Sequence, residues 1–257
     1  MNLLPIGSMG IMMPIAGIAS GGAPSYSTSA SRFGGGNFYT KNNPLPATTG
    51  LTFIFAAKLA ADEAMQPIFH KVGFSQRSGE LAIQSGTLAT NHRALIGVTR
   101  DAGLSQLSAA QYTTETADAN WTSWFAFGYS ISTAGGSTDL QIMMNGANVI
   151  SGAPSITAGT MSFVTYSGGN MTFGNHAQYV DFSHIWWAAE YVDLSTKWNK
   201  FFDGDNKPID LGADGSTPTG RQPEHFAPDG DLANNLGSYS NWGETGTVTA
   251  APTSPTD

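Results

Sequence analysis

Apolar and polar residues alternate along short segments of this chain, and the alternation predicts β-strands. The segment 51–59 has apolar side chains at every second position, beginning at Leu51. The segment 121–133 has the same period, with one apolar face made of Phe125, Phe127, Tyr129 and Ile131. A period of two places such side chains on one face of a strand. Further strands are expected at 32–40, 67–72, 80–84, 94–100, 139–144, 161–166 and 171–174.

Turn residues separate these segments and favour antiparallel pairing. Asn145-Gly146 is the strongest short hairpin signal, and a return strand is expected to begin at Val149. The three glycines within 32–40 indicate a bulge in a first strand. Strands do not alternate with helices along the chain, so a parallel α/β sheet is disfavoured. The pattern therefore predicts an all-β protein, built as an antiparallel β-sandwich or jelly roll.

A strand followed by one short helix closes this β-rich region. The predicted strand 182–192 is apolar on both faces, and one of them carries Ile185, Trp187, Ala189 and Tyr191. Ser195 is the expected N-cap, because its hydroxyl can accept a bond from a free helical N–H group. The helix is expected over 196–202, stopped by Gly204. Glycine and proline then predict loops, with one further strand within 236–248.

The chain resembles the laminin-G-like, concanavalin-A-type sandwiches found in many bacteriophage virion and prophage proteins. The opening FGGGNFYTKNNPLPATTGLTFIFAAKL and the hairpin WTSWFAFGYSISTAGGSTDLQIMMNGANVI carry the resemblance at the level of pattern. The closing MTFGNHAQYVDFSHIWWAAEYVDLS and the tail FFDGDNKPIDLGADGSTPTGRQPEHFAPDG are more specific. The resemblance spans 31–257 and implies a concanavalin A-like jelly roll with one short C-terminal helix. It also implies a virion protein whose partners are other virion proteins and copies of itself.

Charged residues are few, and their balance argues against nucleic acid as a partner. Only 12% of the 257 residues are charged, and the net charge is −8 with 11 scattered basic residues. Phosphate backbones require clusters of lysine and arginine. The chain has no cysteine, which excludes disulfides, thiolate zinc sites and thiol nucleophiles.

The first 31 residues carry no charged side chain. A solvated disordered arm is usually charged or strongly polar, and methionine-rich segments adapt to irregular surfaces. We therefore expect 1–30 to be an arm that docks on a neighbouring subunit. A signal peptide or membrane helix is not expected, because no positive region precedes the apolar run and Pro5 and Gly7 interrupt it. The predicted domains are this arm, a sandwich with its closing helix at 31–203, and a looped extension at 204–257.

No catalytic site is predicted. Sandwiches of this type include glycoside hydrolases, which need two carboxylates facing each other across a cleft. In the family's enzymes these acids lie in a Glu-x-Asp-x-x-Glu strand. The nearest match here is Glu190 and Asp193, whose spacing puts them on opposite faces, and the third acid is absent. We interpret Glu190 as an edge residue and Asp193 as a helix-capping acid.

The sequence also predicts no bound cofactor. None of the histidines is paired at metal-ligand spacing, and each is interpreted as structural or surface-exposed; they are His70, His92, His176, His184 and His225. The segment Asp203-Gly204-Asp205-Asn206, with Asp210, resembles a loose calcium loop but lacks the glutamate at its twelfth position. A turn after the helix accounts for it. Calcium is the alternative, since the resembling sandwiches sometimes hold that ion at one end.

Aromatic residues raise the question of sugar binding. Trp186 and Trp187 lie in a predicted strand and are interpreted as core. Trp121, with Asp118 and Asn120 before it, lies at a loop–strand junction. The loop Asn91-His92-Arg93 forms another polar rim. Either place could bind a glycan, with simple packing as the alternative at Trp121.

These features predict a non-enzymatic structural component of a phage or phage-like particle, located in the virion. It would be a capsid decoration, a head spike, or a tail or fibre protein that presents a lectin-like sandwich. The alternative is a glycan-binding module for host attachment, which is compatible with the first role. A glycoside hydrolase is a second alternative, disfavoured by the missing acid pair. Nucleic acid binding and membrane insertion are not expected.

Overall fold

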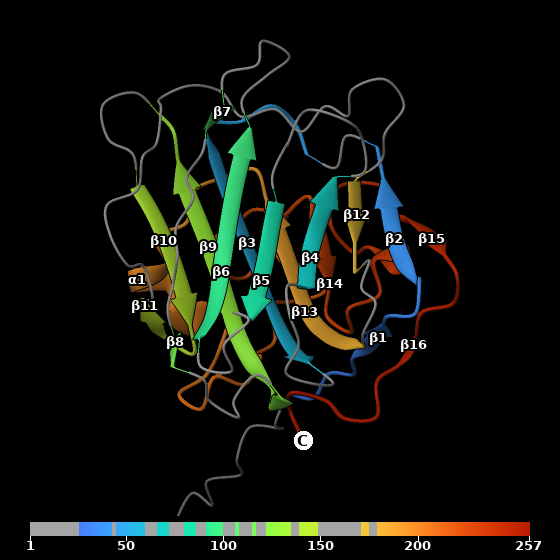
Figure 1. The fold of residues 1–257 in the computed structure, drawn as a ribbon. Helices are drawn as coiled ribbons and strands as arrows, with labels where there is room; N and C mark the ends of the chain where they lie inside the picture. Colours follow the sequence, from blue (N-terminus) through green and yellow to red (C-terminus); the bar gives the residue numbers. More distant parts are fainter. Residues whose placement is uncertain are drawn as a thin grey trace, which may run out of the picture.

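The computed structural model describes residues 26–42, 45–59, 66–71, 80–85, 91–99, 106–107, 115–116, 122–134, 139–148, 171–174 and 179–257. Two antiparallel sheets pack face to face (Figure 1). The first sheet has the order β11-β10-β9-β3-β13-β1-β16, and β14 also pairs with β13. The second has the order β15-β2-β12-β4-β5-β6-β7, and β8 also pairs with β6. The predicted all-β sandwich with one short C-terminal helix is confirmed.

The strands of the first sheet are β1 (Ser31–Phe33), β3 (Gly50–Leu59), β9 (Phe125–Ser132), β10 (Asp139–Met144), β11 (Ala147–Asn148), β13 (Val180–Ala188), β14 (His225–Ala227) and β16 (Thr249–Ala250). Those of the second are β2 (Phe38–Lys41), β4 (Gln66–Lys71), β5 (Glu80–Ser85), β6 (Asn91–Thr99), β7 (Gln106–Leu107), β8 (Glu115–Thr116), β12 (Met171–Phe173) and β15 (Gly243–Thr245). The helical elements are α1 (Leu194–Lys197) and the 3-10 turns η3 (Trp198–Lys200) and η4 (Leu232–Asn234). The expected strand 161–166 lies outside the described residues.

Aromatic side chains fill the space between the sheets, as the alternation in 51–59 and 121–133 predicts. Phe55 and Phe127 face the same cluster from β3 and β9, with ring centroids 4.9 Å apart. Phe173 of the second sheet meets Phe182 of the first at 4.8 Å. Burying such rings is the main favourable contribution to folding.

The outer face of the first sheet is buried as well. The segment that follows β13 folds back over it, so Phe201 and Phe202 pack with Trp186 in a second apolar cluster. Gly128 of β9 permits a close approach, because a Cβ there would lie 2.8 Å from the Trp198 ring. This cover explains why β13 is buried at every position and reads as apolar on both faces.

Two details of β13 and its helix differ from the sequence prediction. The strand ends at Ala188 instead of residue 192, and the helix begins at Leu194 instead of residue 196. Asp193, and not Ser195, is the N-cap: its carboxylate accepts a bond from the Ser195 N–H at 3.1 Å. The Ser195 hydroxyl donates to the same oxygen of Asp193. A carboxylate here satisfies the first free amides more strongly than a hydroxyl does.

The segment 32–40 is also two strands and not one bulged strand. Its glycines have positive φ at Gly34, Gly35 and Gly36, which turns the chain sharply between β1 and β2. β1 pairs with β13 in the first sheet, whereas β2 pairs with β12 in the second. The glycine run therefore carries the chain from one sheet to the other. The predicted Asn145-Gly146 hairpin is confirmed between β10 and β11, with positive φ at both residues. Its return strand begins at Ala147 and not at Val149, because the two-residue turn leads directly into the pairing with β10.

The C-terminal segment adds strands to both sheets. β14 pairs with β13 and β16 with β1, while β15 pairs with β2. Tyr39 of β2 donates its hydroxyl to Asp231 at 2.7 Å, and Asp231 caps η4 by accepting from the Ala233 N–H. Burial and this bond raise the pKa of Tyr39. Residues 204–257 thus contribute to the sandwich itself. In the described part of the chain, none of the helices could span a bilayer.

Candidate functional site

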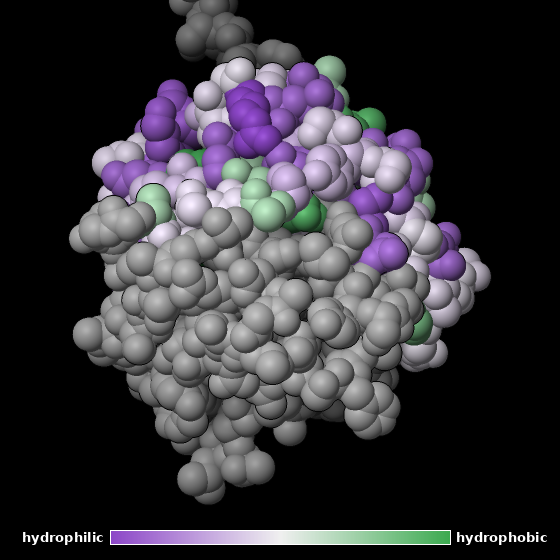
Figure 2. Space-filling model, turned by 90° about the horizontal axis from the view of Figure 1, so that it is seen from above, coloured by the Kyte–Doolittle hydropathy of each residue, from purple (hydrophilic) through white to green (hydrophobic). Residues whose placement is uncertain are grey.

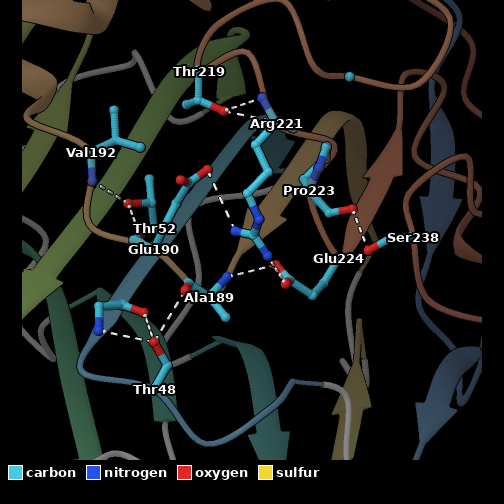
Figure 3. A network of polar contacts seen from close by, with 12 residues as sticks. Thr48, Thr52, Ala189, Glu190, Val192, Thr219, Arg221, Pro223, Glu224 and Ser238 are labelled. Carbon is cyan, nitrogen blue, oxygen red and sulfur yellow. Dashed lines mark hydrogen bonds and ion pairs between the residues drawn. The ribbon is translucent and has the colours of Figure 1, made fainter.

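The C-terminal end of β13 carries a cluster of charged side chains, which we call the Arg221 cluster and define as Glu190, Arg221 and Glu224. Glu190 follows β13, whereas Arg221 and Glu224 precede β14. The pairing of Trp187 with His225 brings the two segments together. Figure 3 shows the guanidinium of Arg221 between the two carboxylates.

Glu224 anchors this cluster. Its side chain is only 3% exposed, and one carboxylate oxygen accepts a bond from Arg221. The other accepts from the Ala189 N–H at 2.7 Å. Both oxygens are therefore engaged, which stabilises a buried charge.

Glu190 and Arg221 are less constrained. The Glu190 side chain is 27% exposed and that of Arg221 is 47% exposed, and Oε1 of Glu190 lies 3.8 Å from Nη1 of Arg221. Oε1 is buried and accepts no hydrogen bond from any described residue. The Glu190 backbone is fixed, because Thr52 donates to its carbonyl at 2.8 Å. The cluster thus presents a part-exposed acceptor beside a half-exposed donor on a fixed main chain.

Such a pair can hydrogen-bond to a polyhydroxylated ligand. A carboxylate accepts from hydroxyls, and a guanidinium offers several N–H donors in a rigid plane. Glu190 and Asp193 make separate contacts. Asp193 caps α1 and accepts from Gln141 at 2.7 Å, and bonds from Ser195 and Gln141 lower its pKa. The interpretation of Asp193 as a capping acid is confirmed.

Arg221 and Glu224 were missed by sequence reasoning, since they lie in a segment rich in turn residues. The sequence shows only an Arg and a Glu spaced by three, in a region that also contains Asp210, Asp214, Asp229 and Asp231. That spacing alone does not show that both residues meet Glu190. The contact depends on β14 pairing with β13, which was not predicted.

The suspected calcium loop is a turn whose carboxylates bind backbone amides. Asp203 accepts from the N–H groups of Asp205 and Lys207, both at 2.9 Å. Asn206 accepts from the Trp198 indole at 3.1 Å, and Asp210 accepts from the Gly212 N–H. No group of three or more potential metal-ligating side chains occurs among the described residues. The carboxylates of Asp203 and Asp210 are therefore engaged by backbone amides.

The histidines that can be placed are buried in apolar surroundings. His225 accepts a bond from the Trp242 indole at 3.2 Å. His184 is fully buried, and neither of its nitrogens has a hydrogen-bond partner among the described residues. His176 lies outside those residues, and for His70 and His92 only the backbone is described.

The tryptophans of β13 are core residues, as predicted. Trp186 is fully buried and donates to the Gly215 carbonyl at 2.8 Å, while Trp187 packs on Phe53. The predicted rim at Asp118, Asn120 and Trp121 lies outside the described residues. The other predicted rim, Asn91-His92-Arg93, begins β6, where only the backbone is described. Glycan binding at Trp121 and at Asn91-His92-Arg93 therefore stays a prediction.

Comparison with known proteins shows the fold. No family model matches the chain, and no curated protein matches it. Among solved structures, a candidate carbohydrate-binding protein from Bacteroides ovatus ATCC 8483 matches with a TM-score of 0.55 and 10% identity, over 88% of this chain and 60% of that one. A heptameric SAP-like pentraxin from Limulus polyphemus matches with a TM-score of 0.49 and 12% identity, over 86% and 94%. The likeness to the Bacteroides ovatus protein shows the fold, an antiparallel β-sandwich.

Proposed function

We propose that this protein binds carbohydrate and does not cleave it. The observation that carries the proposal is the likeness of fold to the Bacteroides ovatus protein, which extends over 88% of the chain. Folds of this kind host more than one activity, so the likeness is an analogy that the site chemistry must support. The virion role predicted from the sequence has no such support and becomes the second candidate.

The Arg221 cluster suits this function. Glu190 and Arg221 offer an acceptor and donors beside each other, and neither is fully buried. The surface seen in Figure 2 is also mainly hydrophilic where residues are described, with hydrophobic groups in small separate patches. Large exposed apolar areas mark protein docking sites, whereas sugar hydroxyls require polar partners on a firm support.

A glycan array tests the proposal, using the wild-type protein and Glu190→Gln. We expect the wild type to bind a defined set of glycans and Glu190→Gln to bind about tenfold more weakly, since it loses a charged acceptor. Asp205→Asn is the matched control, because Asp205 is an exposed acid outside the cluster. A flat array for the wild type would refute the proposal. Polysaccharide turnover that disappears in Glu190→Gln would make the protein a hydrolase instead.

The second candidate function, a structural part of a phage particle in the virion, rests on the uncharged first 31 residues. An arm of that composition favours contact with neighbouring copies. Sedimentation of the full chain against a variant that begins at residue 26 tests this role. An oligomer of the full chain that becomes a monomer in the variant would support this role. Two monomeric proteins would contradict it.

A further inference from the structure

Tyr179 is an exposed aromatic residue at the opposite end of β13 from the Arg221 cluster. Its side chain is 50% exposed, and Leu236 is the other large hydrophobic residue exposed in the described part of the chain, at 36%. An exposed aromatic ring offers a flat apolar surface on which a ligand can pack.

The ring is held in place by a charged pair. The guanidinium carbon of Arg32 lies 5.5 Å from the centroid of the Tyr179 ring, within the range of a cation–π contact. Arg32 donates to both carboxylate oxygens of Asp181, at 2.6 and 2.8 Å. Asp181 is 2% exposed and faces Arg32 across the β1–β13 pairing. The fork geometry fixes the guanidinium, which in turn supports the ring.

A turn of glycines borders the hydroxyl end of the ring. A Cβ placed on Gly35 would lie 3.9 Å from the Tyr179 hydroxyl, and one placed on Gly36 would meet no atom within 4 Å. Both glycines have positive φ, which other residues rarely adopt, so the turn that borders Tyr179 carries no side chain. A ligand that approaches the hydroxyl end of the ring therefore meets no side chain from this turn.

We propose that Tyr179 is a stacking platform for a pyranose ring of a neutral glycan. The apolar face of the sugar packs on the exposed tyrosine ring, which is pre-organised by Arg32. Nη1 of Arg32, which does not take part in the fork with Asp181, donates to a hydroxyl of that sugar. A neutral sugar is favoured because Asp181 neutralises Arg32 and the chain carries a net charge of −8. This inference rests on the proposed carbohydrate binding and adds a second contact site to it.

Calorimetric titration with the strongest neutral glycan from the array tests the platform. We expect Tyr179→Ala to weaken binding about tenfold and Tyr179→Phe to retain it, because stacking needs the ring and not the hydroxyl. Leu236→Ala is the matched control and should bind like the wild type. Thermal unfolding of each variant checks that it is folded.

The outcomes separate this inference from the proposed function. If the wild type binds and Glu190→Gln weakens binding while Tyr179→Ala does not, the platform is refuted and carbohydrate binding stands. If the preferred glycans are acidic, the neutral-sugar assignment is wrong. If the wild type binds no glycan, the platform and the proposed function both fail.

Discussion

At the scale of single residues, His184 combines two unfavourable features. Its φ is 56°, a left-handed conformation that non-glycine residues adopt at a cost. Its imidazole is fully buried beside the rings of Phe202 and Phe226, without a hydrogen bond from the described residues. Burial lowers the pKa of His184 to about 3. The folded protein therefore holds a neutral histidine where the unfolded chain holds one that protonates readily.

The resulting pH dependence can be measured. Between pH 6.5 and about 3 the unfolded chain binds a proton at His184 and the folded chain does not. Stability should thus fall with falling pH in this window, by about 1.4 kcal/mol per pH unit from this residue. His184→Asn tolerates the left-handed φ but does not titrate, so its unfolding free energy should depend less steeply on pH. An identical slope in chemical denaturation of the two proteins would contradict the assignment.

Substitutions at two glycines distinguish the cost of a positive φ from the cost of a steric clash. Gly230 and Gly220 share a φ of 79°, but a Cβ at Gly230 would lie 2.3 Å from the Phe182 carbonyl oxygen, and one at Gly220 would meet nothing within 4 Å. Gly220→Ala should cost about 1 kcal/mol from φ alone. Gly230→Ala should cost about 3 kcal/mol, because backbone atoms must also move. Equal losses in urea unfolding would show that the close approach to β13 is not tight.

At the scale of elements, β13 shows how far the sequence predicts the fold. Alternation in β3 and β9 identifies the inward-facing rings correctly, because those strands pair without interruption. In β13 the register shifts between Ser183 and Trp186, so Phe182 and Ile185 face the same side although they are three residues apart. A β-bulge inserts one extra residue into β13, and His184 adopts the positive φ within it. A histidine gives no sign in the sequence that it adopts positive φ, so the bulge was not predictable.

The first described residues and the C-terminal tail hold each other in place. Thr28 donates its N–H to Thr256 at 3.2 Å, and its carbonyl accepts from the hydroxyls of Ser254 and Thr256. The double substitution Ser254→Ala with Thr256→Ala should cost about 2 kcal/mol and speed amide exchange at Thr28. Thr249→Ala, an exposed position in β16, is the control. Unchanged exchange at Thr28 in the double variant would show that the tail does not retain this segment.

At the scale of the whole molecule, the fold was more predictable than the site. Periodicity and turn signals specify two packed sheets because a buried face repeats at every second residue. The contacts within the Arg221 cluster depend on long-range pairing between β13 and β14. The exposure of Tyr179 depends on which other segments pack around it. Neither leaves a local pattern in the sequence. The predicted glycan rims at Trp121 and at Asn91-His92-Arg93 stay predictions, whereas the proposed sites at Glu190 and Tyr179 came from the structure.

The central claim is the proposal that this β-sandwich binds carbohydrate without cleaving it. Saturation-transfer NMR of the full chain with a neutral oligosaccharide reports both properties in one sample. The account predicts saturation of sugar ring protons and no new anomeric signals from released reducing ends. Absence of saturation transfer across a panel of neutral and acidic oligosaccharides, or the steady appearance of such anomeric signals, would contradict it.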